Sequence, residues 1–286
     1  MMQNSSVEDT YFGSISSIRV GDKLLDLSIP VVMGILNVTP DSFFEGSREQ
    51  STAGAVEKAR AMISEGAKII DIGGYSTRPG ADEIPVEEEV NRVVPIIRSL
   101  RKEFPDLAIS IDTFRSKVAE EAVLAGANII NDVSGFEIDP AIIEVAAKHG
   151  TPYILMHMRG TPETMQSLTE YDNLFKDISL YFSRKIERLK DAGVKDVILD
   201  PGFGFAKNIE QNYDLLRNIE AFHLFGKPIL AGLSRKSMIY KKLGITPEES
   251  LNGTIALNAI ALQKGAKILR VHDVKEAVEL VELLKK

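Results

Sequence analysis

The chain has 286 residues and carries 34 Lys and Arg against 41 Asp and Glu, which gives a formal net charge of −7. Sequence-independent nucleic-acid binding depends on an excess of basic residues, so we expect no nucleic-acid partner. The chain contains no Cys, which excludes disulfides, Cys-ligated zinc, iron–sulfur clusters and a thiol nucleophile and is compatible with the cytoplasmic location that we expect.

The N-terminal segment is polar and acidic. Residues 1–14 lack the apolar stretch of a signal peptide, and no apolar run in the chain approaches the ~18 residues that a membrane helix needs. We therefore expect a flexible N-terminus over residues 1–14, no membrane partner, and one domain over residues 15–286. Residues 14–30 are predicted to form a β-hairpin.

Eight short apolar runs follow the hairpin, and each is typical of a strand buried on both faces of a parallel sheet. They span residues 31–37, 67–73, 108–112, 127–132, 153–157, 197–200, 228–232 and 266–271. Helical patterns lie between them, for example over residues 86–100, 174–189 and 274–284. Glycines that are expected to cap the C-terminal ends of helices stand just before the strands, at Gly66, Gly126, Gly150, Gly193, Gly226 and Gly265.

Eight strand–helix units in about 250 residues are typical of a (β/α)₈ barrel. An open, doubly wound sheet is the alternative, but no G-x-G-x-x-G turn follows the first strand. We predict an α/β fold with a single (β/α)₈ barrel domain, whose N-terminal end the hairpin closes.

Polar side chains gather at the expected carboxyl ends of the strands, where barrels of this class have their active sites. Asp112, Asn131 and Asp200 offer acceptors that suit a planar ligand rich in N–H donors. Asn37 and Asp41 are oxygen ligands of the kind that binds Mg²⁺ beside substrate phosphates. Cations suited to a phosphate-bearing ligand are also present: Arg78, Arg235, Lys236, Arg270 and His272. Each residue alone has an ordinary structural alternative, such as a helix N-cap for Asp, and their convergence predicts a heterocycle pocket beside an anion site.

Other polar residues are expected to be structural. The histidines at 149, 157 and 223 lack metal-ligand spacing. Gly202 and Gly204 are expected to form a tight loop beside the pocket, since no phosphate-binding motif follows them. Lys207, Lys241 and Lys242 are expected to be solvated.

The motifs at the strand ends resemble, in order, those of the dihydropteroate synthase family. The matching segments are MGILNVTPDSF (33–43), DIGG and STRPGA (71–74 and 76–81), SIDT (110–113), INDVSG (130–135), LDPGFGF (199–205), LSRKS (233–237) and RVHD (270–273). They lie on seven of the eight expected strands, which is a specific signal.

The resemblance implies a reaction between two small molecules. The amine of p-aminobenzoate displaces diphosphate from 6-hydroxymethyl-7,8-dihydropterin diphosphate, which gives 7,8-dihydropteroate for folate biosynthesis. The path it implies is S_N1-like, with positive charge spread over the methylene and the pterin ring. The resemblance also implies a (β/α)₈ fold, Mg²⁺ as the cofactor and a homodimer.

The resemblance also assigns roles to individual residues. It implies that the pterin is held by Asp112, Asn131, Asp200 and Lys236, with Met156 against its ring face. It implies that Asn37 binds Mg²⁺, and that the diphosphate meets Arg270 and His272. Thr77 and Arg78 would reach the substrates from a loop, and p-aminobenzoate would be bordered by Pro79, Phe205 and Ser237. The residues expected to act in the chemistry are Asp112, Asp200, Lys236, Arg270 and His272.

Two segments depart from the family pattern. Tyr75 stands where the family often has Glu, and residues 44–47 replace a small-residue, Asp-Gly-Gly stretch. Both are expected in loops, where they affect loop closure rather than the pterin pocket.

Two other functions remain as alternatives. A pterin-binding barrel of a methyltetrahydrofolate methyltransferase would share the acceptors but would not need Arg270, His272, Lys236 and Asn37 together. A non-catalytic paralogue would be expected to lose Asn37, Arg78 or Lys236. The apolar stretch from Leu251 to Leu262 is either a dimer face or a barrel helix that packs inward.

Overall fold

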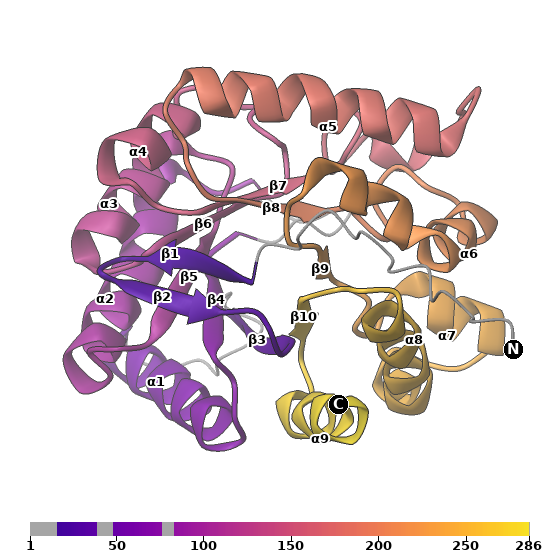
Figure 1. Cartoon of the computed structure of the whole chain (residues 1–286). Coiled ribbons are helices and arrows are strands. Elements are labelled where there is room, and N and C mark those ends of the chain that lie inside the picture. Colours follow the sequence, from indigo (N-terminus) through magenta and orange to yellow (C-terminus); the bar gives the residue numbers. More distant parts are fainter. Residues whose placement is uncertain (1–15, 39–47, 76–82, 286) are drawn as a thin grey trace, which may run out of the picture.

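A computed structural model describes residues 16–38, 48–75 and 83–285. This part of the chain forms one α/β domain in which helices surround a barrel of parallel strands (Figure 1). The segment predicted to be flexible, residues 1–14, lies outside the described residues. Among the helices of the described ranges, none is both long and apolar enough to cross a membrane.

The barrel consists of eight parallel strands, close to the eight predicted runs. They are β3 (Val31–Asn37), β4 (Ile69–Gly73), β5 (Ala108–Asp112), β6 (Ile129–Asp132), β7 (Tyr153–Met156), β8 (Val197–Asp200), β9 (Leu230–Ala231) and β10 (Ile268–Val271). Their order in the sheet is β8-β7-β6-β5-β4-β3-β10-β9. A parallel bridge between Leu199 and Ile229 joins the two ends of the sheet, so the barrel prediction is confirmed and the open-sheet alternative is wrong.

Helices connect the strands and cover the outside of the barrel (Figure 1). They are α1 (Arg48–Ser64), α2 (Val86–Glu103), α3 (Ser116–Ala125), α4 (Ile142–His149), α5 (Leu174–Asp191), α6 (Ile209–Arg217), α7 (Ser237–Leu243), α8 (Leu251–Gln263) and α9 (Val274–Leu284). Three short 3₁₀ helices are η2 (Met165–Ser167), η3 (Ile219–Phe225) and η4 (Glu248–Ser250). All six glycines predicted at helix ends have φ between 60° and 121°, the left-handed region that favours Gly at a C-cap.

Two apolar layers hold the barrel together. Because successive residues of a strand point to opposite faces, Ile70 packs toward the helices while Ile69 points into the barrel. The inner cluster is formed by the first residues of the strands and includes Val31, Met33, Ile69, Ala108, Ile129, Ile154, Ile198, Leu230 and Ile268.

The predicted hairpin closes the N-terminal end of the barrel. Its strands β1 (Ser17–Val20) and β2 (Lys23–Asp26) are antiparallel, and Ile18, Val20 and Leu27 are buried in the inner cluster. The hairpin therefore fills the N-terminal end of the barrel, and the carboxyl ends of the strands remain for the site.

Helix α8 is buried on one side and exposed on the other. Its buried residues are Thr254, Asn258 and Ala261, whereas Ala256 and Ile260 are exposed. The half-buried Ile255, Leu257, Ala259 and Leu262 pack against the core, so inward packing accounts for part of the apolar stretch 251–262.

Candidate functional site

Strand register places the predicted polar residues at one level of the barrel. Asn37, the last residue of β3, pairs with Gly73, which pairs with Asp112 at the end of β5. Asp112 in turn pairs with Asn131 on β6. Across the barrel, Asp200 ends β8 and pairs with Met156, the last residue of β7. Parallel strands end at the same side of a barrel, so residues more than 150 positions apart meet at one mouth.

Arg270 on β10 links the acidic residues directly. Its Nε donates to Oδ2 of Asp71 at 2.6 Å, and its Nη2 donates to Oδ2 of Asp112 at 2.5 Å. Asn131 Nδ2 donates to the same Oδ2 of Asp71 at 3.0 Å. Asp71 is fully buried, so these contacts compensate a carboxylate that would otherwise be costly to bury.

Asp71 is a site residue that the sequence interpretation missed. It lies in the middle of strand β4, flanked by Ile70 and Ile72. Asp is almost never fully buried unless it has a partner. An Asp inside a buried strand is therefore the sequence signal by which Asp71 could have been found. In the sequence, Asp71 is marked only as the first residue of the segment DIGG.

Acceptors and cations are not as separate as the sequence predicted. Arg270 lies among the acidic residues rather than on a distinct anion-binding lip. Arg235 is likewise engaged, since its Nε and Nη2 donate to the two carboxylate oxygens of Asp273 at 3.1 and 2.6 Å. Both guanidinium groups predicted at the anion site therefore already have carboxylate partners in the structure, and their contact with a phosphate group stays a prediction.

Lys236 lies close to Asp200 and to the loop that follows β8. Its Nζ donates to the carbonyl oxygen of Phe203 at 2.5 Å and lies 4.4 Å from the ring centre of Phe205. Asp200 accepts a hydrogen bond from the backbone N–H of Gly202 at 2.8 Å. Burial raises the pKa of Asp200, and the nearby charge of Lys236 lowers it.

His272 is anchored by the loop after β9. Its Nδ1 lies 2.9 Å from Ser234 Oγ, which also accepts a hydrogen bond from the His272 backbone N–H at 3.2 Å.

Arg235 adopts a positive φ of 55°, a conformation that non-glycine residues rarely adopt. Two contacts hold Arg235 in this conformation. Its backbone N–H donates to Thr254 Oγ1 at 3.1 Å, and its guanidinium binds Asp273. Ser237, the first residue of α7, is half-buried just beyond.

An apolar cluster lies beside these polar residues. It contains Phe114, Val133, Met156, Met158, Met165 and Ala206, and the half-buried rings of Tyr75 and Phe205 pack against it. Apolar and aromatic side chains next to a few converging polar groups are typical of sites for flat organic ligands. Met156 and Phe205 were predicted at the site, whereas the others were not.

Tyr75 belongs to this apolar cluster rather than to the acidic group. Its ring meets Phe114 edge to face at 5.2 Å, and the Arg115 guanidinium lies 5.0 Å from the ring centre. Burial raises the pKa of Tyr75. At the end of β4 this chain therefore has an aromatic contact to Arg115.

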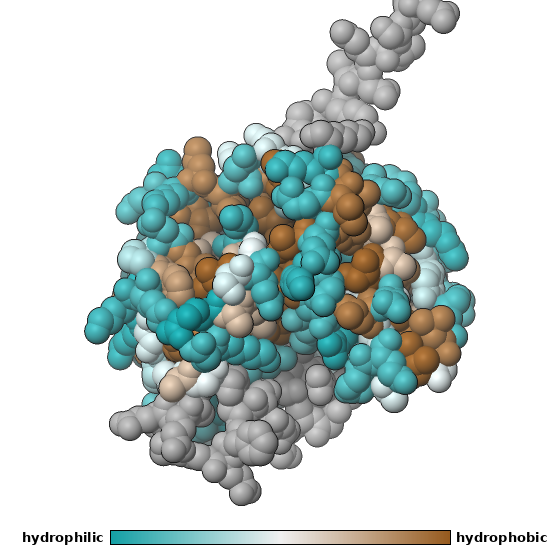
Figure 2. Space-filling view, turned by 90° about the horizontal axis from the view of Figure 1, so that it is seen from below, coloured by the Kyte–Doolittle hydropathy of each residue, from teal (hydrophilic) through white to brown (hydrophobic). Residues whose placement is uncertain are grey.

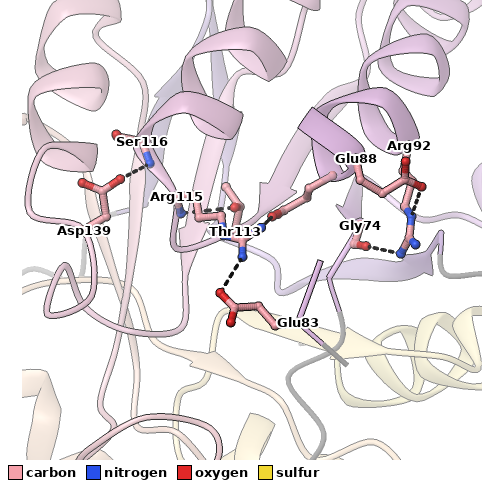
Figure 3. A network of polar contacts seen from close by, with 9 residues as sticks. Gly74, Glu83, Glu88, Arg92, Thr113, Arg115, Ser116 and Asp139 are labelled. Atoms are coloured by element: carbon pink, nitrogen blue, oxygen red, sulfur yellow. Dashed lines mark hydrogen bonds and ion pairs between the residues drawn. The ribbon is translucent and has the colours of Figure 1, made fainter. Parts of the chain in front are cut away.

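A polar network fixes the backbone next to Asp112 (Figure 3). Arg115 donates to the buried Glu89 at 3.0 Å and lies 3.6 Å from Glu83. Its backbone N–H donates to Thr113 Oγ1 at 3.2 Å, and the Gly74 carbonyl accepts from Arg92 at 3.1 Å. The network joins the ends of β4 and β5 to the start of α2, and it keeps the two strand ends in place.

Burial perturbs the titration of the central residues. It raises the pKa of Asp112 to about 7, even though Arg270 lowers it. It lowers the pKa of Lys236 to about 8 against the effect of Asp200. Burial, together with Arg270 and Arg235, lowers the pKa of His272 to about 4. Such shifts at converging groups are characteristic of functional sites.

One prediction about the surroundings of the site is wrong. Lys207, expected to be solvated, is 3% exposed, and its Nζ lies within hydrogen-bond distance of His157 Nδ1. Lys241 and Lys242 are exposed, as predicted, and Gly202 and Gly204 form a tight loop with φ values of 71° and 82°.

Several predicted residues lie outside the described residues. These are Asp41 and residues 44–47 in the first loop, and Thr77, Arg78 and Pro79 in the second.

The described ranges contain no group of three or more His, Asp or Glu side chains that is arranged to hold a metal ion. Asn37 is half-buried at the end of β3, and its Oδ1 lies near Gly73 and the Asp112 side chain. A single amide ligand suits Mg²⁺, which usually keeps several waters and binds mainly through substrate phosphates.

The chain is similar in sequence and in fold to known proteins. The sequence matches the family described as pterin binding enzyme over residues 33–272. The dihydropteroate synthase of Escherichia coli (strain K12) is 48% identical over 262 residues, which are 91% of this chain and 92% of that protein. A structure of Yersinia pestis dihydropteroate synthase with a sulfonamide drug complex has a TM-score of 0.88 and 45% identity, and covers 94% of this chain and 98% of its own. A structure of Xanthomonas albilineans dihydropteroate synthase with 4-aminobenzoic acid has a TM-score of 0.88 and 38% identity. The match covers 96% of this chain and 98% of that one.

Proposed function

The chain belongs to the pterin-binding enzymes and, among them, to the dihydropteroate synthase family, and from this membership we propose how its residues carry out the family reaction. A dihydropteroate synthase is a transferase that condenses 6-hydroxymethyl-7,8-dihydropterin diphosphate with p-aminobenzoate and releases diphosphate. The observation that carries the proposal is the convergence of Asp71, Asp112, Asn131 and Arg270 at the barrel mouth.

Asp112, Asn131 and Asp200 are proposed to bind the pterin. Ionised carboxylates accept hydrogen bonds from the ring and amino N–H groups of the pterin, and such charge-assisted bonds are the strong ones. Lys236 donates to the acceptor edge of the ring. Met156, which is buried at the end of β7, packs against the ring face.

Asp112 and Asp200 also have an electrostatic role. In the reaction the bond between the exocyclic methylene carbon and the ester oxygen breaks, and its electron pair leaves with diphosphate. The positive charge then spreads over the methylene and the ring, where fixed carboxylates stabilise it. The amine lone pair of p-aminobenzoate forms the new C–N bond, and the amine proton passes to solvent.

His272 and Arg270 are proposed to meet the diphosphate. Arg270 Nε and Nη2 bind carboxylates, so it contributes its positive charge to the leaving group while staying oriented by Asp71 and Asp112. His272 is held neutral by its lowered pKa and offers a ring N–H. Thr77, Arg78 and Pro79, in the second loop, and the pair Phe205 and Ser237 are proposed to contact the substrates, the last two at p-aminobenzoate.

Mg²⁺ is proposed as the cofactor, with Asn37 as its protein ligand. When it is bound with the substrate, the ion neutralises diphosphate charge and improves the leaving group. The support is the position of Asn37 Oδ1 at the site level of the barrel, near Asp112.

A homodimer and a cytoplasmic location complete the proposal. Figure 2 views the molecule from below Figure 1, the side on which α1 and α9 lie, and apolar side chains are exposed there among polar ones. Leu243, Ile260 and Leu283 are 60%, 37% and 82% exposed. Exposed apolar residues on neighbouring helices favour an interface, and a second copy of the chain is the partner that we propose.

A product assay tests the function. Purified protein with Mg²⁺, the dihydropterin diphosphate and p-aminobenzoate is expected to release diphosphate and to form dihydropteroate, both measured by chromatography. Omission of Mg²⁺ in the presence of a chelator is expected to abolish turnover. Methyl transfer from methyltetrahydrofolate, or pterin binding without any product, would reject the proposal in favour of one of the two alternatives.

A further inference from the structure

Lys207 is a buried lysine to which the reaction assigns no role, and burial lowers its pKa to about 7 against the effect of Asp200. Its side chain is 3% exposed. Its Nζ lies 3.0 Å from His157 Nδ1, 3.0 Å from the carbonyl oxygen of Gly202 and 2.9 Å from that of Phe205. An ammonium group has three N–H donors, so these three acceptors use all of them.

The carbonyls that Lys207 binds belong to the two ends of one loop. Within this loop Gly202, Gly204 and Ala206 all have positive φ, of 71°, 82° and 50°. The value at Ala206 is unusual for a residue with a Cβ, so the loop needs contacts that fix it. Besides Lys207, these contacts are the hydrogen bonds from the Gly204 N–H to Asn212 and from the Tyr171 hydroxyl to the Ala206 carbonyl.

The middle of the same loop contacts Lys236. The Phe203 carbonyl accepts from Lys236 Nζ at 2.5 Å, and the Phe205 ring lies 4.4 Å from that nitrogen. A Cβ atom on Gly204 would lie 3.1 Å from Lys236 Cδ, so the backbone and the lysine side chain are packed together. The loop position thus determines where the Lys236 ammonium and the Phe205 ring lie.

We propose that Lys207 is a positioning residue for p-aminobenzoate use: it holds the 202–205 loop so that the Phe205 ring forms the side of the site that receives this substrate. The inference rests on the proposed function. Lys207 touches neither substrate, and it acts through the two carbonyls that it binds. His157 supplies the third acceptor, and burial lowers its pKa well below the usual value, which keeps Nδ1 free to accept.

Two substitutions and a matched control test the inference. Lys207→Met keeps the length of the side chain and removes all three donors, whereas Lys207→Gln keeps an N–H donor without the charge. Lys185 on α5 is the control, because it is also buried, at 5% exposed, but binds the carbonyl of Gly135, in the loop after β6. For each variant we would measure KM for both substrates, kcat, the affinity for a free pterin by calorimetry, and the melting temperature.

Lys207→Met is expected to raise KM for p-aminobenzoate about tenfold, the loss of roughly one hydrogen bond to a charged group. Free-pterin affinity should fall by a smaller factor, about threefold at most, since Asp112 and Asn131 lie on other strands and only Lys236 and Asp200 contact the loop. Lys207→Gln should show a smaller increase in the same constant, and Lys185→Met should leave it unchanged. If Lys207→Met does not fold, Lys207→Gln makes the same comparison.

The outcomes separate this inference from the proposed function. If the wild-type enzyme forms no dihydropteroate, the function fails and the inference with it. If the wild type is active but the folded Lys207 variants keep a wild-type KM for p-aminobenzoate, only the inference is overturned. It is also overturned if both KM values and the pterin affinity change equally, or if Lys185→Met has the same effect, because those results indicate a purely structural role.

Discussion

Arg270 is the residue on which the geometry of the barrel mouth depends most. It joins Asp71 on β4 to Asp112 on β5, although these positions are 199 and 158 residues away from it in the chain. Asp71 in turn orients Asn131. One guanidinium therefore fixes an acceptor arrangement that spans four strands, and it does so before any substrate binds.

Removal of this guanidinium is expected to destabilise the fold. Arg270→Ala leaves Asp71 buried with only the amide of Asn131 as partner, and breaking a buried pair costs about 3–5 kcal/mol. Chemical denaturation would measure the change in the free energy of unfolding. Arg217→Ala is the control, since the Arg217–Asp214 pair is 63% and 56% exposed and such pairs contribute about 0–1 kcal/mol. Equal effects of the two substitutions would contradict the role given to Arg270.

The raised pKa of Asp112 and the lowered pKa of Lys236 predict a bell-shaped pH dependence of kcat/KM. Pterin binding requires the Asp112 carboxylate, so activity should fall as the pH drops through about 7. It requires the Lys236 ammonium, so activity should also fall as the pH rises through about 8. The two apparent values belong to the coupled site. Calorimetry with a free pterin should show the acid limb in wild type and its loss in Asp112→Asn, and an unchanged acid limb in that variant would assign the titration to another group.

At the scale of residues, the sequence predicted which polar residues lie at the barrel mouth better than it predicted which of them bind one another. Asp112, Asn131, Asp200 and Arg270 do meet at one mouth, because strand ends could be recognised from apolar runs. The contact of Arg270 with carboxylates was not predicted, since pairing depends on side-chain directions that linear spacing does not contain. The prediction that Lys207 is solvated was wrong for the same reason, because nothing near it in the sequence indicates that a loop buries its side chain.

Elements were predicted more closely, because each has a local physical cause. Buried parallel strands produce continuous apolar runs, and glycines with positive φ end the helices before them. The largest difference is at the seventh strand, where residues 228–232 were predicted and β9 covers only Leu230–Ala231. Pro228 has no N–H to donate to a strand, and only its carbonyl takes part, accepting from the Leu199 N–H at 2.9 Å.

The hairpin is an element with a stabilising role only. Leu27 is fully buried in the inner cluster at the N-terminal end, and Leu27→Ala is expected to lower the free energy of unfolding by about 2–5 kcal/mol. KM for both substrates should not change, because the site lies at the other end of the barrel. Leu24→Ala, at a position 68% exposed, is the control and should change stability by no more than about 0.5 kcal/mol. A changed KM in folded Leu27→Ala would show that the two ends are coupled.

At the scale of the whole molecule, the outer sides of α7, α8 and α9 carry exposed apolar residues. Leu243, Ile260 and Leu283 are exposed, whereas other apolar residues of α8, such as Ile255 and Leu257, pack against the core. The sequence leaves open which side of α8 a partner would cover, since a composition that is apolar all around a helix does not show which face is buried.

The proposed homodimer predicts a specific effect of charge on that surface. Ile260→Glu is expected to convert the dimer to a monomer, because a carboxylate in an apolar interface is desolvated without a partner. Size-exclusion chromatography with light scattering would measure the mass. Leu124→Glu on α3, at a position 65% exposed, is the control and should remain dimeric. A monomeric wild-type protein at micromolar concentration would contradict the proposal.

Acidic and amide residues from distant strands are proposed to bind one flat heterocycle. Titration calorimetry of a free pterin with wild type and Asp200→Ala tests it most directly, since Asp200 is 6% exposed and ends β8. The substitution should weaken binding by ~1.5–3 kcal/mol, which is the contribution of a hydrogen bond to a charged group. An affinity equal to that of wild type, in a variant that retains its fold, would place the pterin elsewhere and contradict the claim.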